Sequence, residues 1–230
     1  LRALLIDAQT PTPDHDAGSY AAVQEMRLLQ SLGFQITFVP QSLTHAGKHT
    51  HDLQRMGVEC LYAPFFTSMA QLLQQRGTEF DLVYITRYNV AEQVIDLVRR
   101  HAPRAKLVLN NADLHFLREL RAAMAAGDAK LKERAFATRD AELAVMRKVD
   151  LVLSYSTVEH AVIQSHNADA TKVMTCPWVA EIPEHIAPFE SRSGIAFLGG
   201  FRHPPNFEAM QYFAEQVMPE LRKRAPEIVL

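Results

Sequence analysis

The chain has few of the features that mark disulfide-rich, membrane-spanning or nucleic-acid-binding proteins. It has two cysteines in 230 residues, Cys60 and Cys176, and each lies in an apolar segment, which predicts buried thiols in a reducing compartment. No apolar run approaches the roughly 20 residues that a membrane-spanning helix needs, and no signal peptide is recognisable. The formal net charge is −2 with scattered Lys and Arg, which does not favour a nucleic-acid partner. These features together predict a cytoplasmic protein.

Several motifs that carry well-known chemistry are also missing. The loop at residues 8–19 has neither the G-x-G-x-x-G dinucleotide fingerprint nor a P-loop lysine. No G-x-S-x-G occurs, so a hydrolase triad has no anchor. His45, His49 and His51 lie close together, but no Cys or carboxylate has ligand-like spacing to them. We therefore interpret this segment as a surface loop and expect no metal site.

What the sequence does contain is a regular alternation of short β-rich runs and longer helical patterns. This alternation predicts an α/β fold with a doubly wound, Rossmann-like parallel sheet. Most of the runs are continuously apolar, as expected for strands buried on both faces. The expected strands are residues 3–7, 35–39, 58–62, 82–86, 106–110, 151–154 and 172–175.

The helices between these strands have readable ends. Gly33 is expected to close the first helix. A helical stretch over residues 114–148 is expected to break near Gly127 and Asp128. Ser156 and Glu159 have the spacing of a capping box at the start of the helix after the sixth strand.

The character of the sequence changes after the seventh strand. We expect a Rossmann-like domain at residues 1–176, a proline-punctuated linker at 177–193, and the first βα unit of a truncated second domain at 194–230. In that unit, residues 195–198 and 228–230 are expected strands and 205–224 an expected helix, so the chain is expected to begin and end inside strands. One such unit cannot bury a core. The face formed by Phe207, Phe213 and Val217 is therefore expected to pack on the first domain, pair with a second copy as a homodimer, or be poorly ordered.

Candidate binding residues follow the carboxyl ends of the strands, where open α/β sheets hold ligands. Gly18 and Ser19 stand at a helix entry whose free N–H groups favour an anion, although a simple helix cap explains them equally well. Arg87 follows the fourth strand and could contact a ligand or form a structural ion pair. After the fifth strand, His115 could bind a sugar hydroxyl, and Asp113 could orient it or bind a hydroxyl itself. Asp113 could instead simply cap the next helix, and a carboxylate there could do both.

The order of the motifs resembles a known family. Residues 2–7, 10–14 and 16–19, the helix end at 28–33, and residues 112–119 are similar to the amino-terminal domain of family 4 glycosyltransferases. Residues 195–206, followed by 208–210 and Phe213, are similar to the opening strand and helix of that family's second domain. The resemblance covers essentially the whole chain.

The resemblance implies a GT-B architecture of two Rossmann-like domains around a cleft. It implies transfer of a sugar from a nucleotide-sugar co-substrate to a glycan or lipid-linked acceptor in polysaccharide biosynthesis. Transfer would proceed with retention of configuration and without a metal or other cofactor, and peripheral contact with a membrane would be compatible with it. The residues implied by position are His115 and Asp113 at the transferred sugar, Asp16 and Arg87 at the acceptor, and Gly18, Ser19, Gly199, Gly200, Arg202 and His203 at the donor.

The sequence departs from the family pattern in several places. Only Gly18 is present where the family has two glycines, and Cys176, Pro177 and Trp178 replace its Pro-Asn-Gly. The donor-binding Arg/Lys pair and E-x7-E carboxylates would lie beyond Leu230, so the chain alone is expected to be inactive. A nicotinamide-dependent oxidoreductase is disfavoured by the missing fingerprint and by Val39 and Pro40 at the second strand's end. A non-hydrolysing sugar-nucleotide epimerase and a catalytically silent binding module remain open alternatives.

Overall fold

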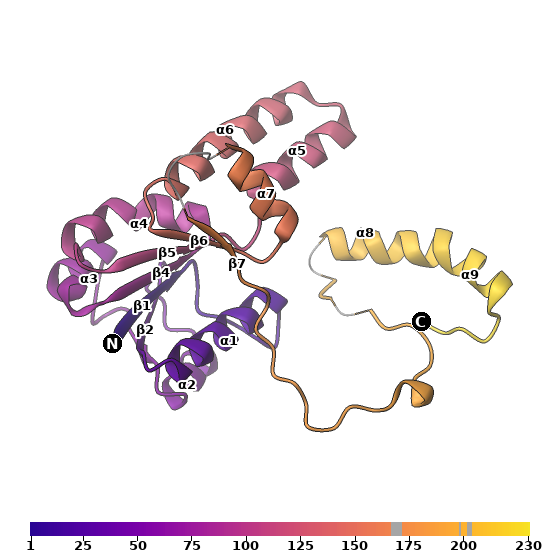
Figure 1. The fold of residues 1–230 in the computed structure, drawn as a ribbon, viewed down its shortest axis with the longest axis horizontal. Helices are drawn as coiled ribbons and strands as arrows, with labels where there is room; N and C mark the ends of the chain where they lie inside the picture. The colour runs from indigo at the N-terminus through magenta and orange to yellow at the C-terminus, as the bar shows by residue number, and fades with distance from the viewer. Residues whose placement is uncertain (167–171, 198, 202–203) are drawn as a thin grey trace.

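One parallel sheet organises most of the protein in the computed structural model, which describes residues 1–166, 172–197, 199–201 and 204–230 (Figure 1). The sheet has seven strands in the order β3-β2-β1-β4-β5-β6-β7, and every neighbouring pair is parallel. The predicted doubly wound α/β fold is confirmed. The strands are β1 (Arg2–Asp7), β2 (Gln35–Pro40), β3 (Glu59–Cys60), β4 (Leu82–Thr86), β5 (Lys106–Asn110), β6 (Leu151–Ser154) and β7 (Val173–Thr175).

Helices cover both faces of the sheet and bury alternate residues of each strand. On one face lie α1 (Ala17–Ser31) and α2 (Lys48–Arg55), and on the other α3 (Met69–Arg76), α4 (Tyr88–His101), α6 (Ala129–Met146) and α7 (Thr157–His166) (Figure 1). The short 3₁₀ turn Gly77–Glu79 follows α3. Leu4 and Ile6 of β1 belong to the core on the α4 side, whereas Ala3 and Leu5 belong to the core on the α1 side. The chain changes faces between β1 and β4, which is the switch point of the sheet.

Helix α5 (His115–Ala126) pairs with α6, and the two extend away from the sheet (Figure 1). The predicted break between them is confirmed. Gly127 adopts a left-handed conformation with φ of 65°, which glycine tolerates without a steric penalty. The Asp128 carboxylate then caps α6 by accepting hydrogen bonds from the backbone N–H groups of Lys130 at 2.8 Å and Leu131 at 3.2 Å.

Three expectations for the first domain need correction. The third strand is only two residues long, because β3 is an edge strand that pairs with β2 alone. His49 and His51 lie in helix α2 rather than in a loop. The capping box is only half formed: the Glu159 N–H donates to Ser156 Oγ at 3.3 Å, but the Glu159 carboxylate accepts from the backbone of Leu114 instead of from its own helix.

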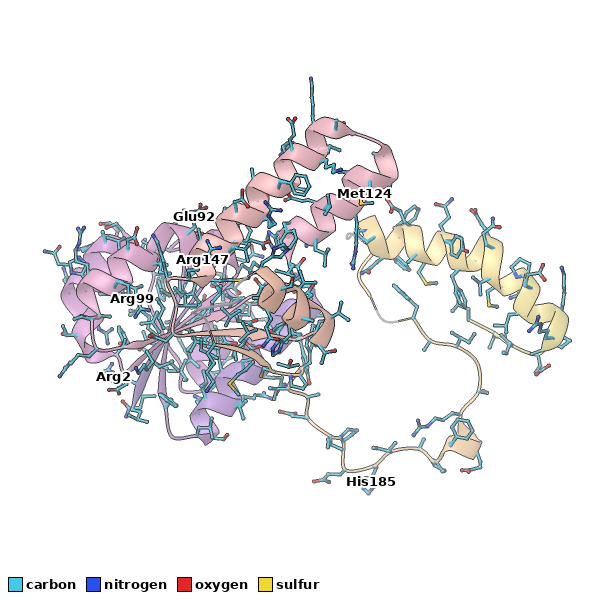
Figure 2. All side chains as sticks on the ribbon, turned by 45° about the horizontal axis from the view of Figure 1, so that its top comes forward. Arg2, Glu92, Arg99, Met124, Arg147 and His185 are labelled. Carbon is cyan, nitrogen blue, oxygen red and sulfur yellow. The ribbon has the colours of Figure 1, made fainter. Side chains whose placement is uncertain are left out.

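After β7 the chain runs through an extended linker, on which Figure 2 labels His185, with one 3₁₀ turn at Phe189–Ser191. It then forms α8 (Pro204–Tyr212), a π-helical stretch (Phe213–Val217) and α9 (Met218–Arg224). These helices lie apart from the sheet (Figure 1), and Phe207 is 56% exposed. Within the described part of the chain, no helix combines the length and hydropathy needed to cross a membrane.

The strand predicted at residues 195–198 is absent at 195–197, and Leu198 lies outside the described residues. Residues 228–230 are also not in a strand. Between residues 195–197 and 228–230, which are all described, one backbone hydrogen bond forms, from the Ile195 N–H to the Val229 carbonyl at 2.9 Å. A strand is stabilised by a ladder of such bonds, and a single bond does not form one.

Candidate functional site

The switch point of the sheet places an ion pair at the carboxyl ends of β1 and β4. Asp7 is the last residue of β1, and Arg87 directly follows β4 and pairs with the Asp7 carboxylate. Arg87 has φ of 74° and ψ of 139°, a conformation that non-glycine residues rarely adopt and that clusters at functional sites. The predicted alternative of an ion pair is therefore what the structure shows, although one third of the Arg87 side chain, 33%, stays exposed.

Burial dominates the electrostatics of this pair. Desolvation raises the pKa of Asp7, while the neighbouring Arg87 guanidinium and the Ala8 N–H act in the opposite direction. The guanidinium also faces the first turn of α1. A Cβ added to Gly18 would lie 3.4 Å from Asp16 Oδ1 and 3.9 Å from Arg87 Nη2. Asp16, Gly18 and Arg87 are thus brought together at one end of the sheet.

Asp16 caps α1. Its Oδ1 accepts from the Ser19 N–H at 2.7 Å, and its Oδ2 accepts from the Ser19 hydroxyl at 2.8 Å. Of the predicted pair Gly18 and Ser19, Ser19 takes part in a helix cap, because its N–H and its hydroxyl both bind Asp16. The N–H groups of Ala17 and Gly18 have no acceptor among the residues that the structure describes, so two donors at the positive end of the helix dipole remain for an anion.

The turn after β5 holds a second polar cluster around His115. His115 Nε2 lies 3.3 Å from Asp113 Oδ1, and Arg118 forms an ion pair with the other oxygen of Asp113. Burial works against ionisation of Asp113, but the hydrogen bond from His115 and the charge of Arg118 lower its pKa below the ordinary value. Asp113 makes no capping bond to α5. The carboxylate therefore contacts the imidazole, and the interpretation that it caps the helix is wrong; its role toward a ligand stays a prediction.

The two clusters are neighbours because Arg87 and Tyr88 are adjacent in the chain. The Tyr88 ring meets the His115 ring edge-on, with centroids 5.0 Å apart and an interplanar angle of 85°. The His115 side chain is 17% exposed, so most of it is enclosed while part still reaches solvent. Imidazole, carboxylate and guanidinium groups thus line one edge of the sheet, with the N–H groups of α1 beside them.

Two adjacent asparagines, Asn110 at the end of β5 and Asn111 directly after it, lie beneath the surface of this edge. Asn110 and Asn111 are buried, at 0% and 1% exposed. Asn110 Nδ2 donates to Tyr155 Oη at 2.7 Å and to Glu25 Oε1 at 3.0 Å. The side-chain amide of Asn111 has no hydrogen-bond partner on either atom in the described structure.

Beneath the switch point lies a buried carboxylate, Glu25 of α1, that the sequence interpretation missed. It accepts hydrogen bonds from the Tyr84 hydroxyl at 2.9 Å and the Tyr155 hydroxyl at 2.5 Å, besides that of Asn110. Burial raises the pKa of Glu25. A cavity of about 10 Å³, roughly one water molecule, lies beside it and is also lined by Asp7. The only signal of Glu25 in the sequence is that a charged residue stands on the apolar stripe of a helix.

Gly200, in the loop before α8, lies close to the first domain. A Cβ added to Gly200 would lie 3.7 Å from the His15 carbonyl oxygen, next to the loop that precedes α1. At Gly199 an added Cβ would lie 2.7 Å from the Phe197 ring, so a larger residue there would displace that side chain. The predicted donor-side residues Arg202 and His203 lie outside the described residues.

The histidines near α2 separate into two groups. His49 Nε2 lies 2.8 Å from Asp14 Oδ1, whereas the His45 ring contacts the rings of His51 and Tyr62. Across residues 1–166, 172–197, 199–201 and 204–230, no three His, Cys, Asp or Glu side chains converge in a way that could hold a metal ion.

Comparison with known proteins identifies the fold. No family model and no curated protein sequence matches the chain. Sucrose-phosphate synthase from Thermosynechococcus elongatus matches in structure with a TM-score of 0.50 and 12% identity, over 77% of this chain and 48% of that one. UGT2 of Phytolacca americana, complexed with UDP-2fluoro-glucose and pterostilbene, matches with a TM-score of 0.51 and 9% identity, over 80% of this chain and 55% of that one.

At these identities the likeness shows the fold alone. The chain has a Rossmann-like α/β fold, which it shares with part of each of these two solved structures. It spans about half the length of the two solved structures.

Proposed function

We propose that this chain is the acceptor-side half of a retaining glycosyltransferase related to family 4. The enzyme would transfer a sugar from a nucleotide-sugar to a glycan or lipid-linked acceptor. One observation carries the proposal: on a Rossmann-like sheet similar to that of UGT2, the switch-point edge gathers Arg87, the free N–H groups of α1 and the Asp113–His115 pair. Departure of a nucleotide diphosphate requires donors and positive charge aimed at developing negative charge, and this edge offers both.

Each group has a role that fits its surroundings. The N–H of Gly18 and the Arg87 guanidinium would face the diphosphate or the acceptor, while Asp16 and Ser19 keep the helix entry in place. His115 would donate a hydrogen bond to a hydroxyl of the transferred sugar, with Asp113 holding the ring. Retention and independence from metal are part of the proposal and rest on the family resemblance of residues 2–19, 112–119 and 195–206.

A second Rossmann-like domain would complete the donor side, with Gly199, Gly200, Arg202 and His203 at its entry. The chain covers only 48% and 55% of the two solved structures, which supports a division of this kind. The chain alone would then bind ligand weakly and not transfer sugar; turnover of a nucleotide-sugar by the isolated chain would contradict this.

Binding by the isolated chain tests the site directly. UDP-glucose titrated into the ¹⁵N-labelled chain should shift the amide signals of Gly18, Arg87 and His115, and His115→Ala should weaken binding roughly tenfold, as expected for loss of a hydrogen bond in an enclosed site. His185→Ala, in the exposed linker, is the matched control and should leave binding unchanged.

The choice of probe is tested in the same experiment by comparing UDP-glucose with NAD. Shifts caused by NAD at the same amides, and none by UDP-glucose or other nucleotide-sugars, would overturn the proposal. So would nucleotide-sugar binding that His115→Ala and Gly18→Leu leave unaffected.

A further inference from the structure

The first turn of α5, which carries His115, has no cap of its own. The N-cap residue is Leu114, whose side chain cannot accept a hydrogen bond. Asp113, the nearest carboxylate in sequence, is engaged by His115 and Arg118. The N–H groups that open the helix therefore need acceptors from elsewhere in the fold.

Those acceptors come from α6 and α7. Glu142 of α6, which is 0% exposed, accepts from the His115 N–H at 2.9 Å through Oε1 and from the Phe116 N–H at 3.0 Å through Oε2. Glu159 of α7 accepts from the Leu114 N–H at 3.3 Å. The backbone of His115 is thus held by a side chain 27 residues further along the chain.

The side-chain contacts of His115 can orient its ring only if its backbone is fixed. Asp113 and Tyr88 contact the imidazole, but Asp113 belongs to the same turn as His115 and would move with it. Glu142 ties that turn to α6, and α6 packs against α4, the helix that begins with Tyr88.

We propose that Glu142 is a positioning residue for His115, which it serves by binding the backbone N–H groups of His115 and Phe116. The value of this position for sugar binding rests on the function proposed above. The Glu142 side chain does not itself line the open edge, since it is buried and its two oxygens accept from the backbone N–H groups of His115 and Phe116.

A carboxylate suits this task because it presents two acceptor oxygens and no donor. A glutamine would accept one of the two bonds and turn an NH₂ group toward the other N–H. Burial raises the pKa of Glu142 to about 7, against the two backbone hydrogen bonds and the His115 charge, which lower it. The other titratable groups that face it are Asp113 from the turn and Tyr88 from α4.

Amide exchange with the whole chain tests the positioning role without any ligand. In Glu142→Gln, protection of the His115 and Phe116 amides should fall roughly three- to tenfold, the effect of one lost hydrogen bond. The Leu143 amide within α6 should keep its protection. Glu133→Gln, an exposed glutamate on the same helix, is the matched control and should change none of these amides.

The wild-type chain gives a second measurement that needs no substitution. Protonation removes one acceptor oxygen, so protection of the two amides should fall as the pH is lowered through about 7. In Glu142→Gln this step should disappear. If the protection of the His115 and Phe116 amides in the wild type does not change with pH across that range, the proposal is overturned, even if the variant fails to fold.

A binding measurement separates positioning from packing. The variant should bind UDP-glucose several-fold more weakly than the wild type, with the nuclear Overhauser contact between the Tyr88 and His115 rings reduced. Altered amides together with unchanged ring contact and unchanged affinity would overturn the positioning role. If the wild type binds no nucleotide-sugar, the proposed function fails, whereas the amide exchange and the ring contact still decide whether Glu142 positions His115.

Discussion

At the scale of single residues, the site is built on buried polar groups whose partners lie far away in the sequence. Asn110, Glu25 and Tyr155 form one such group, linked by hydrogen bonds of 2.5–3.0 Å. Asn111, the next residue along, is equally buried, but its side-chain amide has no hydrogen-bond partner among the described residues. Two adjacent asparagines therefore make opposite contributions to stability.

This contrast gives a paired prediction. Asn110→Leu should lower the free energy of unfolding by about 1–3 kcal/mol, because it strands the donors and acceptors of its partners. Asn111→Leu removes an amide with no partner and should leave the free energy unchanged or raise it. Urea unfolding of both variants measures the difference. A cost at Asn111 equal to that at Asn110 would show that the Asn111 amide is bonded in solution.

At the scale of elements, local sequence signals end α5 and begin α6, whereas the N-terminus of α5 is capped by carboxylates from distant segments. Gly127 and Asp128 stop one helix and start the next through their own conformational and capping preferences.

Asp128→Ala should therefore lower the free energy of unfolding by about 1 kcal/mol, the usual value of an N-cap. Asp140→Ala, an exposed aspartate within α6 that pairs with Arg139, should cost less. Thermal or urea unfolding compares the two, and equal costs would contradict the capping role.

At the scale of the whole molecule, buried carboxyl groups set the pH dependence of stability. Burial raises the pKa of Glu142 to about 7 and also raises those of Asp7, Glu25 and Glu159. Between their ordinary values and the raised ones, the folded protein binds more protons than the unfolded chain. The free energy of unfolding should therefore fall as the pH rises from about 4.5 to about 7.

Urea unfolding across this range measures the effect, and Glu142→Gln should flatten part of the slope. Carboxyl groups with lowered pKa, such as Asp113 and Asp150, act at more acidic pH, where their stabilising charge is lost as the pH falls below about 4. Stability that instead rises steadily from pH 5 to 7 would mean that these buried carboxyls are hydrated in solution.

The sequence by itself determined the strands of the sheet, the break between α5 and α6, and the residues that follow the strand ends. Continuous apolar runs predicted β4, β5 and β6 with the observed bounds, because strands buried on both faces admit little else. Gly127 marked a helix break for a reason local to one residue, its freedom at positive φ. The positions of Arg87, Asp113 and His115 followed from the rule that ligands meet the carboxyl ends of parallel strands.

Only the tertiary structure decided what these residues contact. Asp113 pairs with His115 and Arg118 instead of capping α5, because Glu142 and Glu159, 27 and 45 residues away from the amides they bind, already supply the acceptors there. Residues 195–197 do not form the predicted strand, because a strand depends on the neighbours with which it shares hydrogen bonds. Local patterns report what a segment prefers, whereas a partner from a distant segment becomes available only when the chain has folded.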